Sequence, residues 1–170
     1  MDIILNRRSV RDFDLSKQIS YDELLELCRY GEAAPSARNQ RGREYIIVDD
    51  MKTILELSQV SKGSMILSKC NTLIALVAKN KDELPTPLML EQDLACSVEN
   101  ILLRATEKGF GSCYIGIHPI SERISACDQI FKLSNGMHTF ALIALGYPLK
   151  ADSFYDKEKF DESLVHHNTY

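Results

Sequence analysis

The chain has 170 residues, of which 45% are hydrophobic and 26% are charged, and its formal net charge is −4. This balance excludes disorder of the whole chain and indicates an ordinary globular protein, with a length that predicts one domain over residues 1–170. The slightly acidic total argues against a general nucleic-acid or anionic-membrane binder, so neither partner is expected.

The first third of the chain is predicted to contain one well-marked helix. Ser20 and Glu23 form an S-x-x-E capping box, in which each side chain accepts a backbone N–H at the start of a helix. Gly31 is the expected C-terminal stop of this helix. Residues 34–42 combine proline, serine, asparagine and glycine, which predicts a loop. A strand is expected at 44–48.

The rest of the chain is predicted to alternate helices with buried strands. The uninterrupted apolar run at 72–78 is typical of a strand buried on both faces, although a buried helix segment can have the same run. Apolar spacing within 88–108 marks one face of a long helix, with Gly109 as its left-handed end residue. The other elements are expected in this order: a helix at 51–60 with a weaker continuation at 62–68, a linker at 84–87, a strand at 112–117, a helix at 119–131 with Pro119 in its first turn, a strand at 139–145, and a polar tail from 150.

This order of elements favours an α+β layered domain. A long helix, and not a short crossover, separates the second and third predicted strands, which argues against a strict doubly wound sheet. The five cysteines are odd in number and form no C-x-x-C pair, so neither a zinc site nor a disulfide framework is suggested. With no visible signal peptide, we expect reduced thiols and a cytoplasmic location.

Common catalytic signatures are absent from the sequence. There is no G-x-x-x-x-G-K-[ST], H-E-x-x-H or G-x-S-x-G. Gly109, Gly111 and Gly116 imitate a dinucleotide fingerprint, but Tyr114 stands where the third glycine belongs, and the segment leaves a helix to enter a strand. We interpret it as a helix stop. The four histidines lack metal-ligand spacing and are expected to be structural or solvent-exposed.

Two short segments carry groups suited to binding. Arg7, Arg8, Ser9 and Arg11 bring together forked cationic donors and a hydroxyl, as a phosphate site requires, although arginines near an N-terminus also form solvated faces. The loop 34–40 carries groups that suit the polar edge of a planar heterocycle, and it is equally compatible with an ordinary turn.

Four segments in order, RRSVRDF, APSARNQ, QDLACSVENILLRATEKGFGSCYIG and ALGYP, together resemble the nitroreductase family of flavin enzymes. The resemblance covers nearly the whole chain. It implies a nitroreductase-like layered fold, with a central mixed sheet flanked by helices. It also implies an intertwined homodimer with FMN at the subunit interface, in which the helix around 94–105 is similar to the family's interface helix. The apolar tail residues Leu164 and Val165 are then candidates to pack on the other subunit.

The resemblance also implies which residues bind FMN. Arg7, Arg8, Ser9 and Arg11 match the segment that contacts the phosphate and ribityl chain. The loop that reaches the flavin from the partner subunit corresponds to Pro35, Ser36, Ala37 and Asn39. Ile115 and Gly116 match the opposite wall of the pocket, and Lys157 or Lys159 matches a tail residue that closes on the phosphate.

One stretch departs from the family pattern. After the asparagine and one further residue the family usually continues Gln-Pro-Trp, whereas this chain reads Gln40, Arg41, Gly42 and Arg43. We expect retained FMN binding and altered substrate preference. Arg41 or Arg43 either contacts a charged substrate or the phosphates of a nicotinamide donor, or is a surface arginine.

The expected activity is that of an FMN-dependent oxidoreductase using NADH or NADPH. Hydride passes through the flavin to an electron-poor acceptor, a nitroaromatic or a quinone, in ping-pong order, and no side chain is nominated as catalytic because the flavin carries the chemistry. Oxygen-dependent or dehalogenating chemistry at the same site is one alternative. A non-catalytic flavin-binding module is another, and an anion-binding interaction domain built on the arginines is the third.

Overall fold

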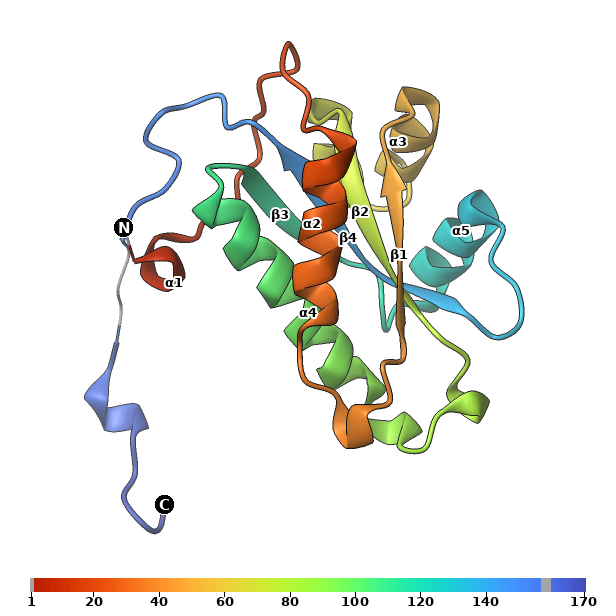
Figure 1. Cartoon of the computed structure of the whole chain (residues 1–170), viewed down its shortest axis with the longest axis vertical. Helices are drawn as coiled ribbons and strands as arrows, with labels where there is room; N and C mark the ends of the chain where they lie inside the picture. The colour runs from red at the N-terminus through yellow and green to blue at the C-terminus, as the bar shows by residue number, and fades with distance from the viewer. Residues whose placement is uncertain (1, 157–159) are drawn as a thin grey trace.

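The protein is described by a computed structural model covering residues 2–156 and 160–170, built around one four-stranded sheet (Figure 1). The spatial order of its strands is β1-β2-β4-β3, and every neighbouring pair is antiparallel. The strands are β1 (Arg43–Val48), β2 (Thr72–Ala78), β3 (Gly111–Gly116) and β4 (His138–Gly146).

The expected α+β layering is confirmed, but the sheet is not mixed in its named strands. Within the described residues the one parallel pairing is an isolated bridge between Ser9 and Ser112. The apolar runs of β2 and β4 identified strands buried on both faces, a pattern frequent in parallel sheets. The direction of the strands, however, depends on the connections: β2 and β3 run the same way on either side of β4, and β4 runs opposite to both.

Helices cover both faces of the sheet and explain why its central strands are apolar throughout. On one face lie α2 (Tyr21–Glu32) and α4 (Leu90–Glu107), and on the other lie α3 (Met51–Ser58) and α5 (Ser121–Phe131) (Figure 1). Alternate residues of β2 divide between the two cores: Ile74 packs with the first pair of helices and Leu73 with the second. The predicted two-sided burial of this strand is confirmed.

The capping box of α2 is formed as predicted, whereas its expected stop is not. The Glu23 N–H donates to Ser20 Oγ, and Glu23 Oε2 accepts the Ser20 N–H at 3.1 Å. Gly31 lies inside the helix, where a Cβ would stand 2.9 Å from Ile101 Cδ1. Its carbonyl accepts the Ser97 hydroxyl at 2.9 Å. Glycine therefore allows α2 and α4 to approach closely here, a requirement that involves residues far away in sequence.

The long helix α4 spans 18 residues and is followed by Gly109 at φ +78°, as predicted. The proline prediction for α5 is wrong, because Pro119 precedes the helix and Ile120 is its N-cap residue. The shorter elements are α1 (Ile3–Asn6) and the 3-10 turns Ala37–Asn39, Ser64–Lys69, Lys81–Glu83, Pro87–Met89 and Glu162–Leu164.

The last described segment, residues 160–170, runs away from the body of the molecule (Figure 1). It carries exposed apolar side chains, among them Phe160 at 66%, Leu164 at 75% and Val165 at 64%. Among the helices of the described residues, none combines the length and the apolar character needed to span a membrane.

Candidate functional site

The N-terminal segment from Arg7 to Phe13, named the arginine segment from here on, runs along the outer edge of β3. Ser9 bridges Ser112 in parallel, and the Val10 N–H donates to the Ser112 carbonyl at 2.9 Å. Val10 and Phe13 are buried at 6% and 5% exposure. The segment is therefore attached to the sheet by backbone pairing with β3 and by its buried apolar residues.

Two glycines of the sheet make room for these apolar anchors. A Cβ on Gly111 would stand 2.8 Å from Val10 Cγ1, and a Cβ on Gly146 would stand 2.9 Å from Phe13 Cδ1. Contacts of that length do not occur between real side chains, so a larger residue at either position would displace the segment. Arg11, between the two anchors, is left exposed.

A cavity of about 390 Å³ opens beside this segment. It is lined by the segment and by the stretch after β4: Arg8, Ser9, Val10, Arg11, Asp12, Lys150, Asp152, Ser153 and Tyr155. The Arg8 guanidinium lies 4.8 Å from the centroid of the Tyr155 ring, and its Nη1 donates to the Arg7 carbonyl at 2.5 Å. Arg8 Nε is buried without a hydrogen-bond partner among the described residues. A buried, charged donor of this kind suits an oxyanion ligand.

The charges around this cavity also favour an anion. Three cationic side chains face two carboxylates, and one of these, Asp12, already accepts a hydrogen bond from Lys69 Nζ at 2.8 Å. That hydrogen bond is the main reason why the pKa of Asp12 lies below its usual value. The cavity therefore keeps an excess of positive charge.

A second cavity, of about 380 Å³, lies along β3 and shares Arg11 with the first. Its lining residues are Arg11, Lys62, Gly63, Ile66, Cys113, Tyr114, Ile115, Gly116 and Arg123. Arg123 Nη1 donates to the Gly116 carbonyl at 3.1 Å. A Cβ on Gly116 would meet no atom of the described chain within 4 Å, so this wall is open backbone. The predicted residues Ile115 and Gly116 are thus joined to the arginine segment through Arg11.

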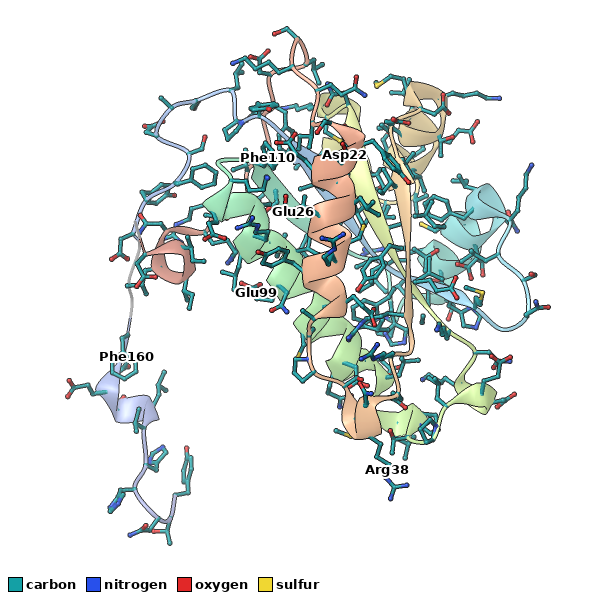
Figure 2. All side chains as sticks on the ribbon, in the orientation of Figure 1. Asp22, Glu26, Arg38, Glu99, Phe110 and Phe160 are labelled. Carbon is teal, nitrogen blue, oxygen red and sulfur yellow. The ribbon has the colours of Figure 1, made fainter. Side chains whose placement is uncertain are left out.

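Arg7 is the one member of the predicted arginine cluster that points elsewhere. Its Nε forms an ion pair with Glu99 Oε1 of α4 at 3.1 Å, and it lines neither of the two cavities. Figure 2 shows Glu99 on the α4 surface that faces the short helix α1. Arg7 therefore fixes the start of the segment to α4.

The second predicted group, Pro35, Ser36, Ala37 and Asn39, lies at the other end of the molecule. Its 3-10 turn packs beside the start of α4, with Arg38 projecting outward, whereas the arginine segment lies near the end of α4 (Figures 1 and 2). A helix of 18 residues is about 27 Å long. One chain therefore does not bring the two predicted groups together.

Polar contacts hold this loop in place. Asp93, buried at 7% exposure, accepts the Ala37 N–H at 2.9 Å and Gln40 Nε2 at 2.6 Å. Ser36 Oγ accepts the Arg41 N–H at 3.1 Å. The Gln40 side chain is thus engaged within the protein and is not free for a ligand.

The two arginines that replace the family pattern have different environments. Arg41 is exposed, with Nε 3.0 Å from Asn39 Oδ1. Arg43 is buried at 4% exposure and donates to the carbonyls of Glu32 and Ala34 at 2.8 and 2.6 Å, besides its ion pair with the Glu32 carboxylate. Neither interpretation of Arg43, as a substrate contact or as a surface arginine, is supported: it stabilises the end of α2.

The histidines and cysteines lie outside the two cavities described above, except for Cys113. His118 stacks on Phe140, His138 Nδ1 lies 3.0 Å from Asp128 Oδ2, and no group of residues in the described chain could hold a metal ion. All five cysteines are free thiols. Burial raises the pKa of the Cys113 thiol, which suits a protonated packing residue.

The structure also adds residues that the sequence did not indicate. Lys150 lines the first cavity, whereas the predicted Lys157 and Lys159 lie outside the described residues. Lys62 and Arg123 line the second cavity. These three basic residues lie far apart in the sequence and belong to no motif. Only the fold shows that each lines a cavity together with Arg11.

The known proteins similar to this chain include several described as nitroreductases. A profile of the family described as "Putative TM nitroreductase" matches residues 1–170. A "Putative NADH dehydrogenase/NAD(P)H nitroreductase" of Archaeoglobus fulgidus is 28% identical over 167 residues, covering 98% of this chain and 95% of that protein.

Solved structures share the fold. A "Putative NADH Oxidase" from Clostridium acetobutylicum superposes with a TM-score of 0.91 at 35% identity, covering 99% of this chain and 100% of that one. An "FMN-dependent Nitroreductase" from Clostridium difficile gives a TM-score of 0.88 at 23% identity, covering 99% of this chain and 98% of that one.

Proposed function

The chain belongs to the nitroreductase family, and on that premise we propose that it is an FMN-dependent oxidoreductase. It passes hydride from NADH or NADPH to an electron-poor acceptor of the nitroaromatic or quinone type. The observation that carries the proposal is the buried Arg8 Nε without a partner among the described residues, in a cationic cavity that Arg11 joins to a second cavity along β3.

The first cavity fits the phosphate of FMN. Leaving a buried charged donor unpaired costs about 1–3 kcal/mol or more, and a phosphate oxygen would accept from Arg8 Nε. Tyr155 stacking and the Arg7 carbonyl hold the Arg8 guanidinium in one orientation before any ligand arrives. Arg8, Ser9, Arg11 and Lys150 form the phosphate subsite, and the tail lysines Lys157 and Lys159 remain predicted contributors.

The second cavity fits the flavin ring and its ribityl chain. The open backbone at Gly116 allows a flat ring to approach the strand, and Ile115 belongs to the same wall. Arg123 holds the Gly116 carbonyl, which fixes the end of β3 at this point. Positive charge around this cavity favours a ligand that carries negative charge. It comes from Arg11, Lys62 and Arg123.

When bound, FMN would supply the redox chemistry, namely hydride transfer from the nicotinamide donor to the acceptor in ping-pong order. The residues of this chain bind and orient the reactants, and no side chain is assigned as nucleophile or general base. Arg41, an exposed cation of the loop, is proposed to influence the choice of acceptor from the partner subunit.

We further propose a homodimer with FMN at the subunit interface. The predicted loop residues lie at the opposite end of the molecule from the arginine segment: Pro35, Ser36, Ala37 and Asn39. A second copy of the chain is therefore needed to bring them to the flavin. The exposed apolar residues of segment 160–170, Leu164 and Val165 among them, are available to pack on that copy. The free thiols support the proposed cytoplasmic location, and the whole chain acts as one FMN-binding domain.

The test is the visible absorption spectrum of the purified protein, recorded before and after anaerobic addition of NADH or NADPH. Flavin bands that bleach with a donor, and return on adding a quinone or nitroaromatic, are the expected result. Bands that persist with both donors would contradict the enzymatic proposal and indicate a non-catalytic flavin module. A protein that stays colourless after addition of FMN would contradict flavin binding altogether.

A further inference from the structure

Asp93 is a buried carboxylate whose hydrogen-bond partners lie far away in sequence. It lies in the first turn of α4, is 7% exposed, and bonds to residues 53 and 56 positions earlier. Oδ1 accepts the Ala37 N–H at 2.9 Å, and Oδ2 accepts Gln40 Nε2 at 2.6 Å. Each oxygen of the carboxylate therefore holds a different residue of the loop.

Those two residues enclose a strained pair. Arg38 and Asn39 have φ angles of 49° and 54°, in the left-handed region that residues with a Cβ rarely adopt. Such a conformation persists only where the surroundings impose it. Asp93 holds the residue before the pair, Ala37, and the residue after it, Gln40, so the carboxylate fixes the turn at both ends.

A second contact fixes the orientation of the Gln40 amide. Its Oε1 accepts the Thr86 N–H at 3.1 Å and lies 2.9 Å from Thr86 Oγ1. The amide nitrogen therefore faces Asp93 and the amide oxygen faces Thr86. Gln40 is thus engaged on both sides, whereas Arg38 and Asn39 are exposed, and Figure 2 shows Arg38 pointing outward.

We propose that Asp93 is a positioning residue, which sets the turn at Arg38 and Asn39 in the shape that meets the flavin bound to the partner subunit. This inference rests on the proposed function for its flavin part, whereas the hold on the turn is a property of the chain itself. Asp93 touches neither cofactor nor substrate in this scheme. It acts through Ala37 and Gln40.

The decisive variants are Asp93→Asn, Gln40→Glu and the double exchange. Asp93→Asn sets an amide nitrogen against Gln40 Nε2, so two donors meet. Gln40→Glu alone sets two carboxylates against each other. In the double variant the new amide at position 93 donates to the new carboxylate at position 40, whose other oxygen accepts from Thr86, so the bonding pattern and the net charge are both restored. Glu107→Gln is the matched control, because Glu107 lies at the far end of the same helix and pairs with Arg104.

Two measurements report on the loop in different ways. FMN affinity is measured on the intact protein by flavin fluorescence, and we expect Asp93→Asn to weaken it about 10- to 100-fold, the range for a lost charged hydrogen bond. Tryptic cleavage after Arg38 and Arg41, followed by mass spectrometry, is expected to become at least about tenfold faster as the turn opens. The double variant should recover most of both losses, and Glu107→Gln should show neither.

The outcomes separate this inference from the proposed function. If the parent protein binds FMN while Asp93→Asn leaves both affinity and cleavage unchanged, the positioning role is wrong. If both singles are impaired and the double variant is no better, Asp93 is a general stability residue and the proposal is overturned. If the parent protein binds no FMN, the proposed function fails together with the flavin part of this inference. Faster cleavage in Asp93→Asn that the double variant reverses would still establish the hold on the turn.

Discussion

The arginine segment and the loop 34–41 are both attached to the same body, but the most deeply buried contacts are apolar in the first and polar in the second. Val10 and Phe13 anchor the arginine segment by apolar burial against two glycines. The loop is anchored by polar groups, chiefly the buried Asp93 and Arg43. In each case the residues that hold the segment differ from those offered to a ligand.

This difference has a consequence for how each region fails. Apolar anchoring tolerates changes of charge and salt, but it depends on volume, since a lost ring leaves a cavity. Polar anchoring depends on each donor and acceptor finding its partner, since an unpaired buried group is costly. The two regions should therefore respond differently to the same kind of substitution.

The largest effect is expected from removing the apolar anchor. Phe13→Ala deletes a ring buried at 5% exposure and should lower the free energy of unfolding by about 3–5 kcal/mol. Urea denaturation followed by circular dichroism measures the change. Leu15→Ala, at a position 53% exposed, is the matched control and should cost far less. Equal effects at the two positions would show that Phe13 does not anchor the segment.

The polar anchor is tested by Arg43→Ala. It removes a buried guanidinium that donates to two carbonyls and to the Glu32 carboxylate, and we expect a loss of about 2–4 kcal/mol in stability. Arg41→Ala, in the same loop but exposed, should change stability by less than about 0.5 kcal/mol. Thermal unfolding of the three proteins compares them directly. A reversed order would refute the assignment of Arg43 as the structural arginine.

The ligand-facing side of the arginine segment is tested by Arg11→Ala. Arg11 lines both cavities, so its removal should weaken FMN binding by about 1.5–3 kcal/mol while leaving stability nearly unchanged. Arg7→Ala should weaken binding less, because the Arg7 guanidinium pairs with Glu99. Fluorescence titration with FMN gives both values. A larger loss for Arg7 than for Arg11 would contradict the position of the phosphate subsite.

The features that could be predicted from the sequence depend on residues close together in the chain, and those that could not depend on contacts between distant residues. Three local signals were reliable: the Ser20 capping box, the apolar run of β2 and the end of α4 at Gly109 all lie where the pattern indicated. Gly31 was misassigned because its role is contact with Ile101 of another helix. Strand direction was missed for a related reason, since it depends on connections and not on local composition.

Within the candidate site the limit is similar. Arg8 and Arg11 could be found because cations cluster in the sequence, and the structure places both on one cavity. Lys150, Asp93 and the true role of Arg43 could not, because each acts on residues that only folding brings near. A lone buried acid such as Asp93 looks like any other acid of a helix.

The smallest expected effect is a dependence on pH of the protection of the arginine segment, which contains the titrating Asp12. Hydrogen bonding from Lys69 holds the pKa of Asp12 in the arginine segment below its usual value of 3.8. A depressed pKa means that this contact is fully present above about pH 4 and is lost as the pH falls through the folded-state pKa, because protonation abolishes the ion pair. Hydrogen exchange at pH 5 and pH 3 should therefore show residues 7–13 loosening in acid. Asp12→Asn should be loosened to a similar extent at both pH values, since it lacks the titrating group. Equal protection of the segment at pH 5 and pH 3 in the parent protein would mean that the Lys69 contact contributes nothing measurable, as is common for exposed ion pairs.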